Sequence, residues 1–208
     1  MLLPHAIMPL SVFEPRYCQM TDHSLDGSGQ LAIATYSHKN CLSDKKSIPP
    51  IREVVCVAQI VHHEKAENGF NMMVYGLCRA KIIEEIKPQG ENLYRKATLK
   101  PLEQEEELDE IFRVELLHML HRPNLSRLEN HESLVNWVVE PGLSNTALFE
   151  LIGCSVFEDA ELRYELLSEP SSEKRSRKVL SELARLDRML SMLDKQSPDD
   201  LEGGVSIN

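Results

Sequence analysis

The sequence predicts an α+β protein, with a β-rich N-terminal part followed by a helical C-terminal part. Residues 1–102 contain short apolar runs separated by Gly, Pro and Asn turn signals, which is typical of strands. Residues 103–195 instead contain apolar side chains at helical spacing. The two kinds of segment do not alternate, as they would in βαβ units. We therefore expect a barrel or sandwich over 1–102, helices over 103–195 and a disordered tail over 196–208.

Composition and charge limit the function classes. The chain has 208 residues, a hydrophobic fraction of 42% and a formal net charge of −10. A nucleic-acid partner is not expected, because such partners are held by Lys and Arg that neutralise phosphates. No apolar run has the length of a transmembrane helix, and the first residues lack the basic segment of a signal peptide. The sequence therefore predicts a cytoplasmic protein without a membrane partner.

The cysteines and histidines do not form a metal-binding pattern. The five cysteines are widely spaced and include no Cys-x-x-Cys pair, so neither zinc nor a disulfide framework is expected. His62 and His63 are neighbours on an expected strand and would point to opposite faces, so they would not share one ion with Glu64. His118 lies on an expected helix that offers no set of three or four ligands. We therefore expect no metal, no cofactor and no catalytic residues.

The first element is a strand that turns into a helix. Leu10 and Val12 alternate with more exposed positions, as in a strand with one buried face. Pro15 disfavours helical backbone at Glu14 but is well tolerated at the first position of a helix. The strand should therefore end at Glu14, with a helix starting at Pro15. Glu14 and Arg16 should form an ion pair across this corner, and a charged ligand site is the alternative.

Five further apolar runs predict the remaining strands, at 31–36, 54–61, 70–75, 77–86 and 94–102. A long polar loop separates the first two of these runs. Asn68 and Gly69 predict a hairpin, because both residues accept positive φ. Gly76 predicts a bulge or bend within the following strand.

Helices are expected from the acidic run 103–107 onward, over 108–120, 132–139 and 145–152, from Ser155 to Pro170, and from Ser172. Gly153 should stop the third helix. Ser155 and Glu158 fit a capping box that starts the fourth. The last helix should pack on the others or on a second copy of the chain, because its leucines have coiled-coil spacing. Its basic cluster should be solvated, and it comprises Lys174, Arg175, Arg177 and Lys178.

Several spaced motifs resemble the N-terminal domain of Lon proteases. Residues 9–17 resemble the signature P-L-x-(I/V)-F-E-P-R-Y, and the structural family motif within it is Phe13, Glu14, Pro15, Arg16 and Tyr17. Leu2-Leu3-Pro4 resembles the end of a V-L-F-P-G strand, with His5 where glycine is usual. The runs V-A-Q-I, Y-G-L-C-R-A-K-I and Y-R-K-A-T-L-K-P-L follow in the family's order. The resemblance implies a PUA-like β pseudobarrel over 1–102, followed by a C-terminal α-helical bundle.

The same resemblance implies a non-catalytic protein-binding or peptide-binding module that recognises substrates of proteolysis. No Gly-x-x-x-x-Gly-Lys-(Ser/Thr) motif occurs, and no serine–lysine dyad motif can be placed. We therefore expect a free-standing Lon N-domain that is not an enzyme. Its expected partners are unfolded or partner polypeptide, a protease or a second copy of itself. Candidate contact residues, chosen for adaptable or amphipathic side chains, are Met8, Tyr36, Met72 and Tyr75.

Two other functions stay open at this stage. PUA-like folds are similar to known RNA-binding modules, although the acidic charge and the scarcity of aromatic residues disfavour RNA. A small metal-dependent hydrolase could use His62, His63 or His118, but it would need a pocket that gathers distant groups.

Overall fold

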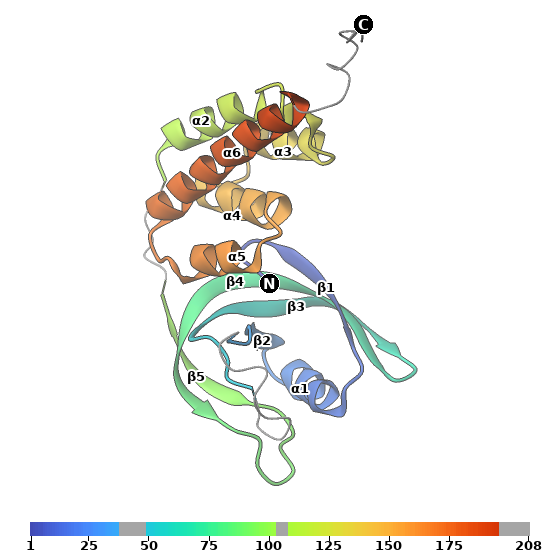
Figure 1. Ribbon diagram of the computed structural model, residues 1–208. Coiled ribbons are helices and arrows are strands. Elements are labelled where there is room, and N and C mark those ends of the chain that lie inside the picture. The colour runs from blue at the N-terminus through green and yellow to red at the C-terminus, as the bar shows by residue number, and fades with distance from the viewer. Residues whose placement is uncertain (38–48, 103–107, 196–208) are drawn as a thin grey trace, which may run out of the picture. The chain divides into compact units, whose positions relative to one another are not determined.

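The structure is a computed structural model that describes residues 1–37, 49–102 and 108–195 (Figure 1). The predicted α+β class is confirmed, because an antiparallel sheet in the first half is followed by helices. The chain forms two compact units. Unit 1 comprises Met1–Glu106 and Glu150–Ser172, and unit 2 comprises Glu107–Phe149 and Glu173–Asn208. The predicted domain boundary after residue 102 stays a prediction. The predicted polar loop, acidic helix start and C-terminal tail lie largely or wholly outside the described residues, so they also stay predictions.

Unit 1 is built on a five-stranded antiparallel sheet with the order β1-β4-β3-β2. The long strand β4 pairs with β3 on one side and with both β1 and β5 on the other. The two runs predicted over 70–86 therefore form one continuous strand. The strands are β1 (Ile7–Val12), β2 (Gln30–Ile33), β3 (Val54–Ala66), β4 (Gly69–Ile86) and β5 (Lys96–Pro101).

The predicted corner after β1 is confirmed. Helix α1 (Pro15–Leu25) starts at Pro15, and Glu14 precedes it with extended backbone, at φ −70° and ψ 135°. The Glu14 carboxylate makes no capping hydrogen bond and lies 2.6 Å from the Arg16 guanidinium. Both side chains are close to half exposed. Proline chemistry thus places the start of the helix, and the expected ion pair forms across the corner.

The hairpin between β3 and β4 forms as predicted, but for a different reason. Ala66 pairs with Gly69, so Glu67 and Asn68 are the two turn residues. Asn68 does not have the expected positive φ. Among the described residues other than glycine, only His5 has a positive φ. Gly69 is needed for close packing instead, since a Cβ there would overlap the carbonyl oxygen of Val12 on β1.

Two register shifts bend the β3–β4 ladder. Val57 pairs with Cys78 and Ala58 with Gly76, which leaves Leu77 as an extra residue beside Gly76, where an irregularity was predicted. The second shift lies between Ile60 and His62, and leaves Val61 as an extra residue on β3. An extra residue opposite one partner is a β-bulge, and it redirects the side chains near it.

A buried ion pair joins the sheet to the helical part of unit 1. Arg79 on β4 is 0% exposed, and one of its terminal nitrogens lies 2.6 Å from a carboxylate oxygen of Glu150, which is 3% exposed. The same nitrogen donates to the carbonyl oxygen of Leu166 at 3.4 Å. Arg79 is the arginine of the Y-G-L-C-R-A-K-I run. The ion pair explains why a charged residue occupies a fully buried position on β4.

Helix α5 (Ala160–Ser168) packs against β3. The backbone N–H of Val54 donates to the hydroxyl of Tyr164 at 3.2 Å, and the Arg52 guanidinium lies 4.2 Å from the centre of the Tyr164 ring. Arg52 also pairs with Glu161. These contacts fix α5 on the sheet through both a hydrogen bond and a cation–π contact.

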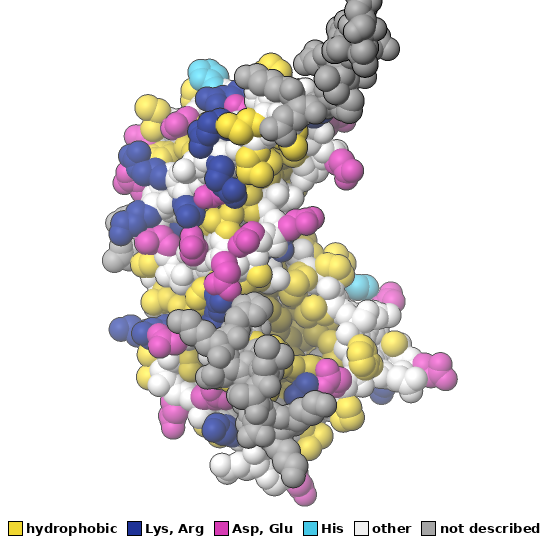
Figure 2. Space-filling view, viewed as in Figure 1, with side chains coloured by type: hydrophobic (Ala, Val, Ile, Leu, Met, Phe, Trp, Pro, Cys, Tyr) yellow, Lys and Arg dark blue, Asp and Glu magenta, His cyan; other side chains and the backbone are white. Residues whose placement is uncertain are grey.

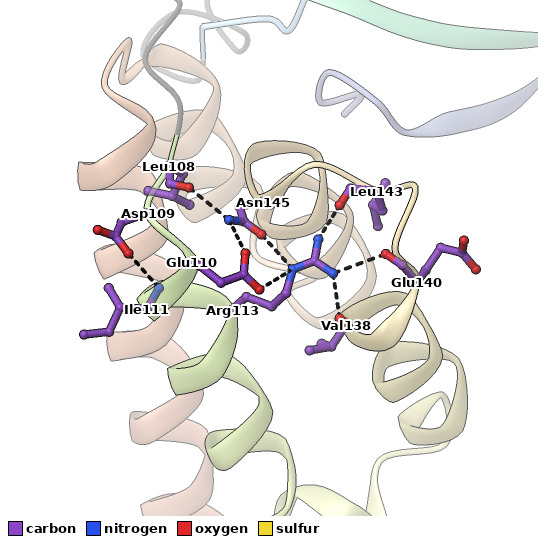
Figure 3. Close-up of polar contacts among 9 residues, drawn as sticks. All are labelled: Leu108, Asp109, Glu110, Ile111, Arg113, Val138, Glu140, Leu143 and Asn145. Atoms are coloured by element: carbon purple, nitrogen blue, oxygen red, sulfur yellow. Dashed lines mark hydrogen bonds and ion pairs between the residues drawn. The ribbon is translucent and has the colours of Figure 1, made fainter.

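Unit 2 is helical and has its own core. Phe112 and Phe149 meet edge to face, with ring centres 6.3 Å apart. Arg113 ties α2 to the turn between α3 and α4 (Figure 3). Helix α4 begins in unit 2 and ends in unit 1. The helices of this part of the chain are α2 (Glu110–Leu120), the short 3-10 helix η2 (Leu125–Arg127), α3 (His131–Val139), α4 (Asn145–Val156) and α6 (Ser172–Lys195).

Three helix predictions are corrected. Gly153 does not stop α4, which continues to Val156. A helical glycine costs only about 1 kcal/mol relative to alanine, and burial of neighbouring side chains offsets this. Asp159, not Ser155, caps α5, since its carboxylate accepts from the N–H of Leu162 at 2.7 Å. Arg175 in the basic cluster is 4% exposed, so the cluster is only partly solvated.

The last helix begins at Ser172, as predicted. Val179 and Leu183 of its leucine seam are buried, whereas Leu193 is 61% exposed.

Trp137 on α3 is half-buried. Among the residues that the structure describes, no helix has the length and apolar character needed to cross a membrane.

Candidate binding surface

The four candidate contact residues from the sequence do not form one site. Met72 is 3% exposed and lies in the core, and Met8 is half-buried on the same face of the sheet. Tyr36 is 44% exposed, with its hydroxyl 3.4 Å from that of Tyr17 in the family motif. Tyr75 is half-buried and points to the opposite face of the sheet from Met8 and Met72.

A row of exposed apolar side chains lies on the face that Tyr75 shares. Directly paired residues of antiparallel strands present their side chains on the same face, and Ile7 pairs with Tyr75 while Pro9 pairs with Met73. The bulge on β3 adds Val61, which is 53% exposed. Ile7 is 57% exposed and Met73 40%. We call this surface the outer strip, which comprises Ile7, Pro9, Val61, Met73 and Tyr75.

A row of polar side chains borders the outer strip. Ser11 pairs with Asn71, which in turn pairs with Glu64 across the three strands β1, β4 and β3. The Ser11 hydroxyl donates to the Asn71 side-chain oxygen at 2.9 Å. The Glu64 carboxylate lies 3.5 Å from His62 Nε2. We call Ser11, Asn71 and Glu64 the polar row.

The outer strip and the polar row meet at a shallow hollow. Its volume is 540 Å³, and its lining combines apolar side chains with hydrogen-bonding groups. It is lined by Pro9, Leu10, Ser11, His62, Glu64, Asn71, Met72 and Met73. Figure 2 shows exposed hydrophobic side chains over both the sheet and the helices of unit 2, whereas Lys and Arg gather mainly over those helices.

The free edge of β1 is less suited to binding than the face of the sheet. Among the described residues, β1 has β4 as its one strand neighbour. The N–H of Gly76 donates to the carbonyl of Ala6 at 2.9 Å. Since hydrogen-bonded and non-bonded pairs alternate, Pro9 occupies a non-bonded pair and its nitrogen faces the free edge. Proline has no N–H to donate there, which interrupts pairing with an added strand.

One end of the outer strip is held in place by His5. Its backbone is left-handed, at φ 64°, and its N–H donates to the carbonyl of Gly76 at 2.8 Å. Its ring nitrogen Nδ1 lies 3.1 Å from the Tyr75 hydroxyl. Left-handed backbone is unfavourable for residues other than glycine, and these two contacts offset the cost. The Tyr75 ring is thereby fixed beside Ile7.

The geometry offers little support for metal or nucleophile chemistry. No group of three or more His, Cys, Asp or Glu able to hold a metal ion occurs within residues 1–37, 49–102 and 108–195. His62 lies on the outer-strip face with Glu64, whereas His63 pairs with Met72. Burial raises the pKa of the Cys154 thiol, which disfavours the reactive thiolate. The hydrogen bond to Tyr36 raises the pKa of Tyr17.

Sequence reasoning missed Ile7, Pro9, Val61 and Met73. A usable signal was present for three of them, because Ile7, Pro9 and Met73 occupy the strand positions that alternate with Met8, Leu10 and Met72. Val61 points outward because of the bulge on β3. The bulge could not be predicted, because the residues of β3 around it form a continuous apolar run.

Comparisons with known proteins agree with this fold. The structure is similar to the N-terminal domain of a Mycobacterium avium complex Lon protease, with a TM-score of 0.65, 19% identity, and coverage of 88% of this chain and 92% of that one. It is also similar to a Lon N-terminal domain protein from Xanthomonas campestris, with a TM-score of 0.58, 15% identity, and coverage of 86% and 91%. At these identities the likeness shows the fold alone. No curated protein sequence matches the chain.

The sequence also matches a protein-family model over most of its length. The matched segment is residues 1–185, which includes the sheet of unit 1, helices α2 to α5 and much of α6. The motifs that resembled Lon N-domains therefore belong to a match that extends well beyond them. The chain belongs to the family of ATP-dependent protease La (LON) substrate-binding domains.

Proposed function

We propose that this protein is a non-catalytic recognition module that binds unfolded polypeptide segments at the outer strip of unit 1. The observation that carries the proposal is the exposed apolar surface formed by Ile7, Val61 and Met73 beside the hollow. Contiguous apolar surface exposed to water is a feature of interaction sites. The family's description as a substrate-binding domain supports the same function.

The chemistry of the outer strip favours weak and adaptable binding. Covering on the order of 300 Å² of apolar surface would contribute about 7 kcal/mol. Loss of translational and rotational freedom offsets much of this gain, so affinities weaker than micromolar are expected. Met73 has a flexible, polarisable side chain that adapts to different partners. A surface of this kind suits many unfolded sequences better than one folded partner.

The charge of the surface also favours polypeptide over nucleic acid. Neither the outer strip nor the polar row contains Lys or Arg, and Glu64 is their one formally charged residue. Phosphate contacts require cationic or well-placed neutral donors.

We also propose that the protein is located in the cytoplasm and acts together with a protease.

Binding of a fluorescently labelled polypeptide, kept unfolded by reduction and alkylation, tests the proposal by fluorescence anisotropy. Met73→Asp and Val61→Asp place a charge on the outer strip and should weaken binding at least tenfold. Ile83→Asp is the matched control, because Ile83 is 59% exposed on the same strand, β4, outside the strip. The proposal is wrong if the wild-type protein does not bind, or if all three variants bind like the wild type.

A further inference from the structure

We propose that the outer strip and the polar row select extended segments with the pattern apolar–x–apolar–x–basic, in which x is any residue. This inference rests on the proposed function and adds a sequence preference to it. It follows from the spacing of the exposed side chains along the strands and from the one charge among them.

The exposed side chains form three successive rows across the strands. Ile7 and Tyr75 form the first row, and Pro9 and Met73 the second, which continues on β3 to His62, the residue paired with Met73, beside the bulge residue Val61. The third is the polar row. Neighbouring rows are two residues apart along β1 and β4, which corresponds to about 6.7 Å.

A bound segment in extended conformation has the same repeat. When it lies along the strands, every second side chain faces the sheet, and successive facing side chains are also about 6.7 Å apart. When the segment runs from the first row toward the polar row, two apolar side chains at positions i and i+2 lie over the first and second rows. The side chain at i+4 then lies over the polar row.

The polar row determines which side chain is favoured at i+4. The Glu64 side chain is 72% exposed, and its contact with His62, at 3.5 Å, leaves much of the carboxylate accessible. A Lys or Arg at i+4 would pair with it, and Ser11 and Asn71 lie in the same row to accept or donate further hydrogen bonds. An Asp or Glu would be repelled, both by Glu64 and by the net charge of −10.

Anisotropy measurements with short labelled peptides in a Gly/Ser background test the inference. We expect a peptide with Leu-Ser-Leu-Ser-Lys to bind three- to fivefold more tightly than the same peptide with Glu in place of Lys, as a surface ion pair allows. It should also bind more tightly than Leu-Leu-Ser-Ser-Lys, which has the same composition with altered spacing. Glu64→Lys should reverse the preference between Lys and Glu, and Glu64→Gln should remove it.

The outcomes separate this inference from the proposed function. If the peptides bind equally well and Met73→Asp still abolishes their binding, the pattern is wrong although the binding surface is right. If neither the peptides nor the unfolded polypeptide binds, the proposed function itself fails. If light scattering shows a dimer that Met73→Asp dissociates, a second copy of the chain occupies the strip and the inference is overturned.

Discussion

Arg79 and Glu150 show how one residue pair can determine the stability of unit 1. Both are almost fully buried and lie 2.6 Å apart. Two buried charges gain little over two apolar side chains of the same size, but one buried charge left alone is strongly destabilising. The pair therefore matters most when one partner is removed.

The first prediction concerns this pair. Arg79→Met should lower the free energy of unfolding by about 3–5 kcal/mol, because it breaks a buried ion pair by removing one of its two partners. Adding Glu150→Leu should restore part of the loss. Urea denaturation followed by circular dichroism measures both effects. Equal stability of the wild type and Arg79→Met would show that the buried pair is not formed.

Asp187 on α6 gives unit 2 a dependence on pH. Its carboxylate accepts from the side chain of Asn124 at 2.8 Å and from Arg122 at 3.1 Å. The hydrogen bond from Asn124 is the largest cause of a lowered pKa at Asp187, and the Arg122 charge adds to it. The native carboxylate therefore binds a proton less readily than the unfolded one.

The second prediction follows from the sign of this shift. The stabilisation by Asp187 is fully present above the unfolded pKa of about 4 and is lost as the pH falls from there through the lower folded pKa. Asp187→Asn should lower stability at pH 7 and make the decline between pH 5 and pH 2 shallower. Urea midpoints measured across this range test it, and an unchanged slope in the variant would contradict it.

At the scale of elements, Arg113 holds together the turn between α3 and α4 (Figure 3). Its guanidinium donates to the carbonyl oxygens of Val138 at 2.7 Å and Glu140 at 3.2 Å, and to that of Leu143. It also donates to the Asn145 side chain at 2.7 Å. These carbonyls lie at the end of α3 and in the loop that follows, where no helical partner is available.

The third prediction tests this role. Arg113→Lys keeps the charge but loses the planar set of donors, so it should cost about 2 kcal/mol of stability. Amide hydrogen exchange should become faster at the end of α3 and the start of α4. Arg185→Lys is a suitable control, because Arg185 is an exposed arginine that pairs with Glu182 on its own helix. Equal exchange in both variants would contradict the role of Arg113.

Elements with strong local signals were predictable from the sequence. Pro15 marked where α1 begins and Gly69 marked the hairpin, and α6 begins at the predicted residue, Ser172. Predictions failed where tertiary contacts outweigh local preference. Helix α4 continues past Gly153 because neighbouring side chains are buried by packing. Strand β1 lies so close to Gly69 that the absence of a Cβ at Gly69 matters more than the φ angle of that residue.

The candidate site was less predictable than the fold. Met72 was chosen as a candidate contact residue, but alternation along β4 places Met72 in the core and Met73 outside. Deciding which alternate residues of β4 face the core requires the register of β4 with β1, and local sequence does not determine that register. The bulge at Val61 depends likewise on how two strands pair.

At the scale of the whole molecule, the sequence motifs identified the family because they mark tertiary contacts. The arginine of Y-G-L-C-R-A-K-I is the buried Arg79, and F-E-P-R-Y forms the corner between β1 and α1. The two units are not continuous in sequence, since residues Glu150–Ser172 belong to unit 1 although the preceding residues belong to unit 2. Local sequence patterns do not predict that a segment returns to the first unit.

The central claim is that polypeptide binds at the outer strip, and methionine-methyl NMR tests it directly. With ¹³C-methyl methionine, adding an unfolded polypeptide should shift and broaden the Met73 signal. The signal of Met8, on the opposite face of the sheet, should move much less, and those of exposed Met189 and Met192 in unit 2 should stay unchanged. Shifts confined to Met189 and Met192, with Met73 unaffected, would contradict the account.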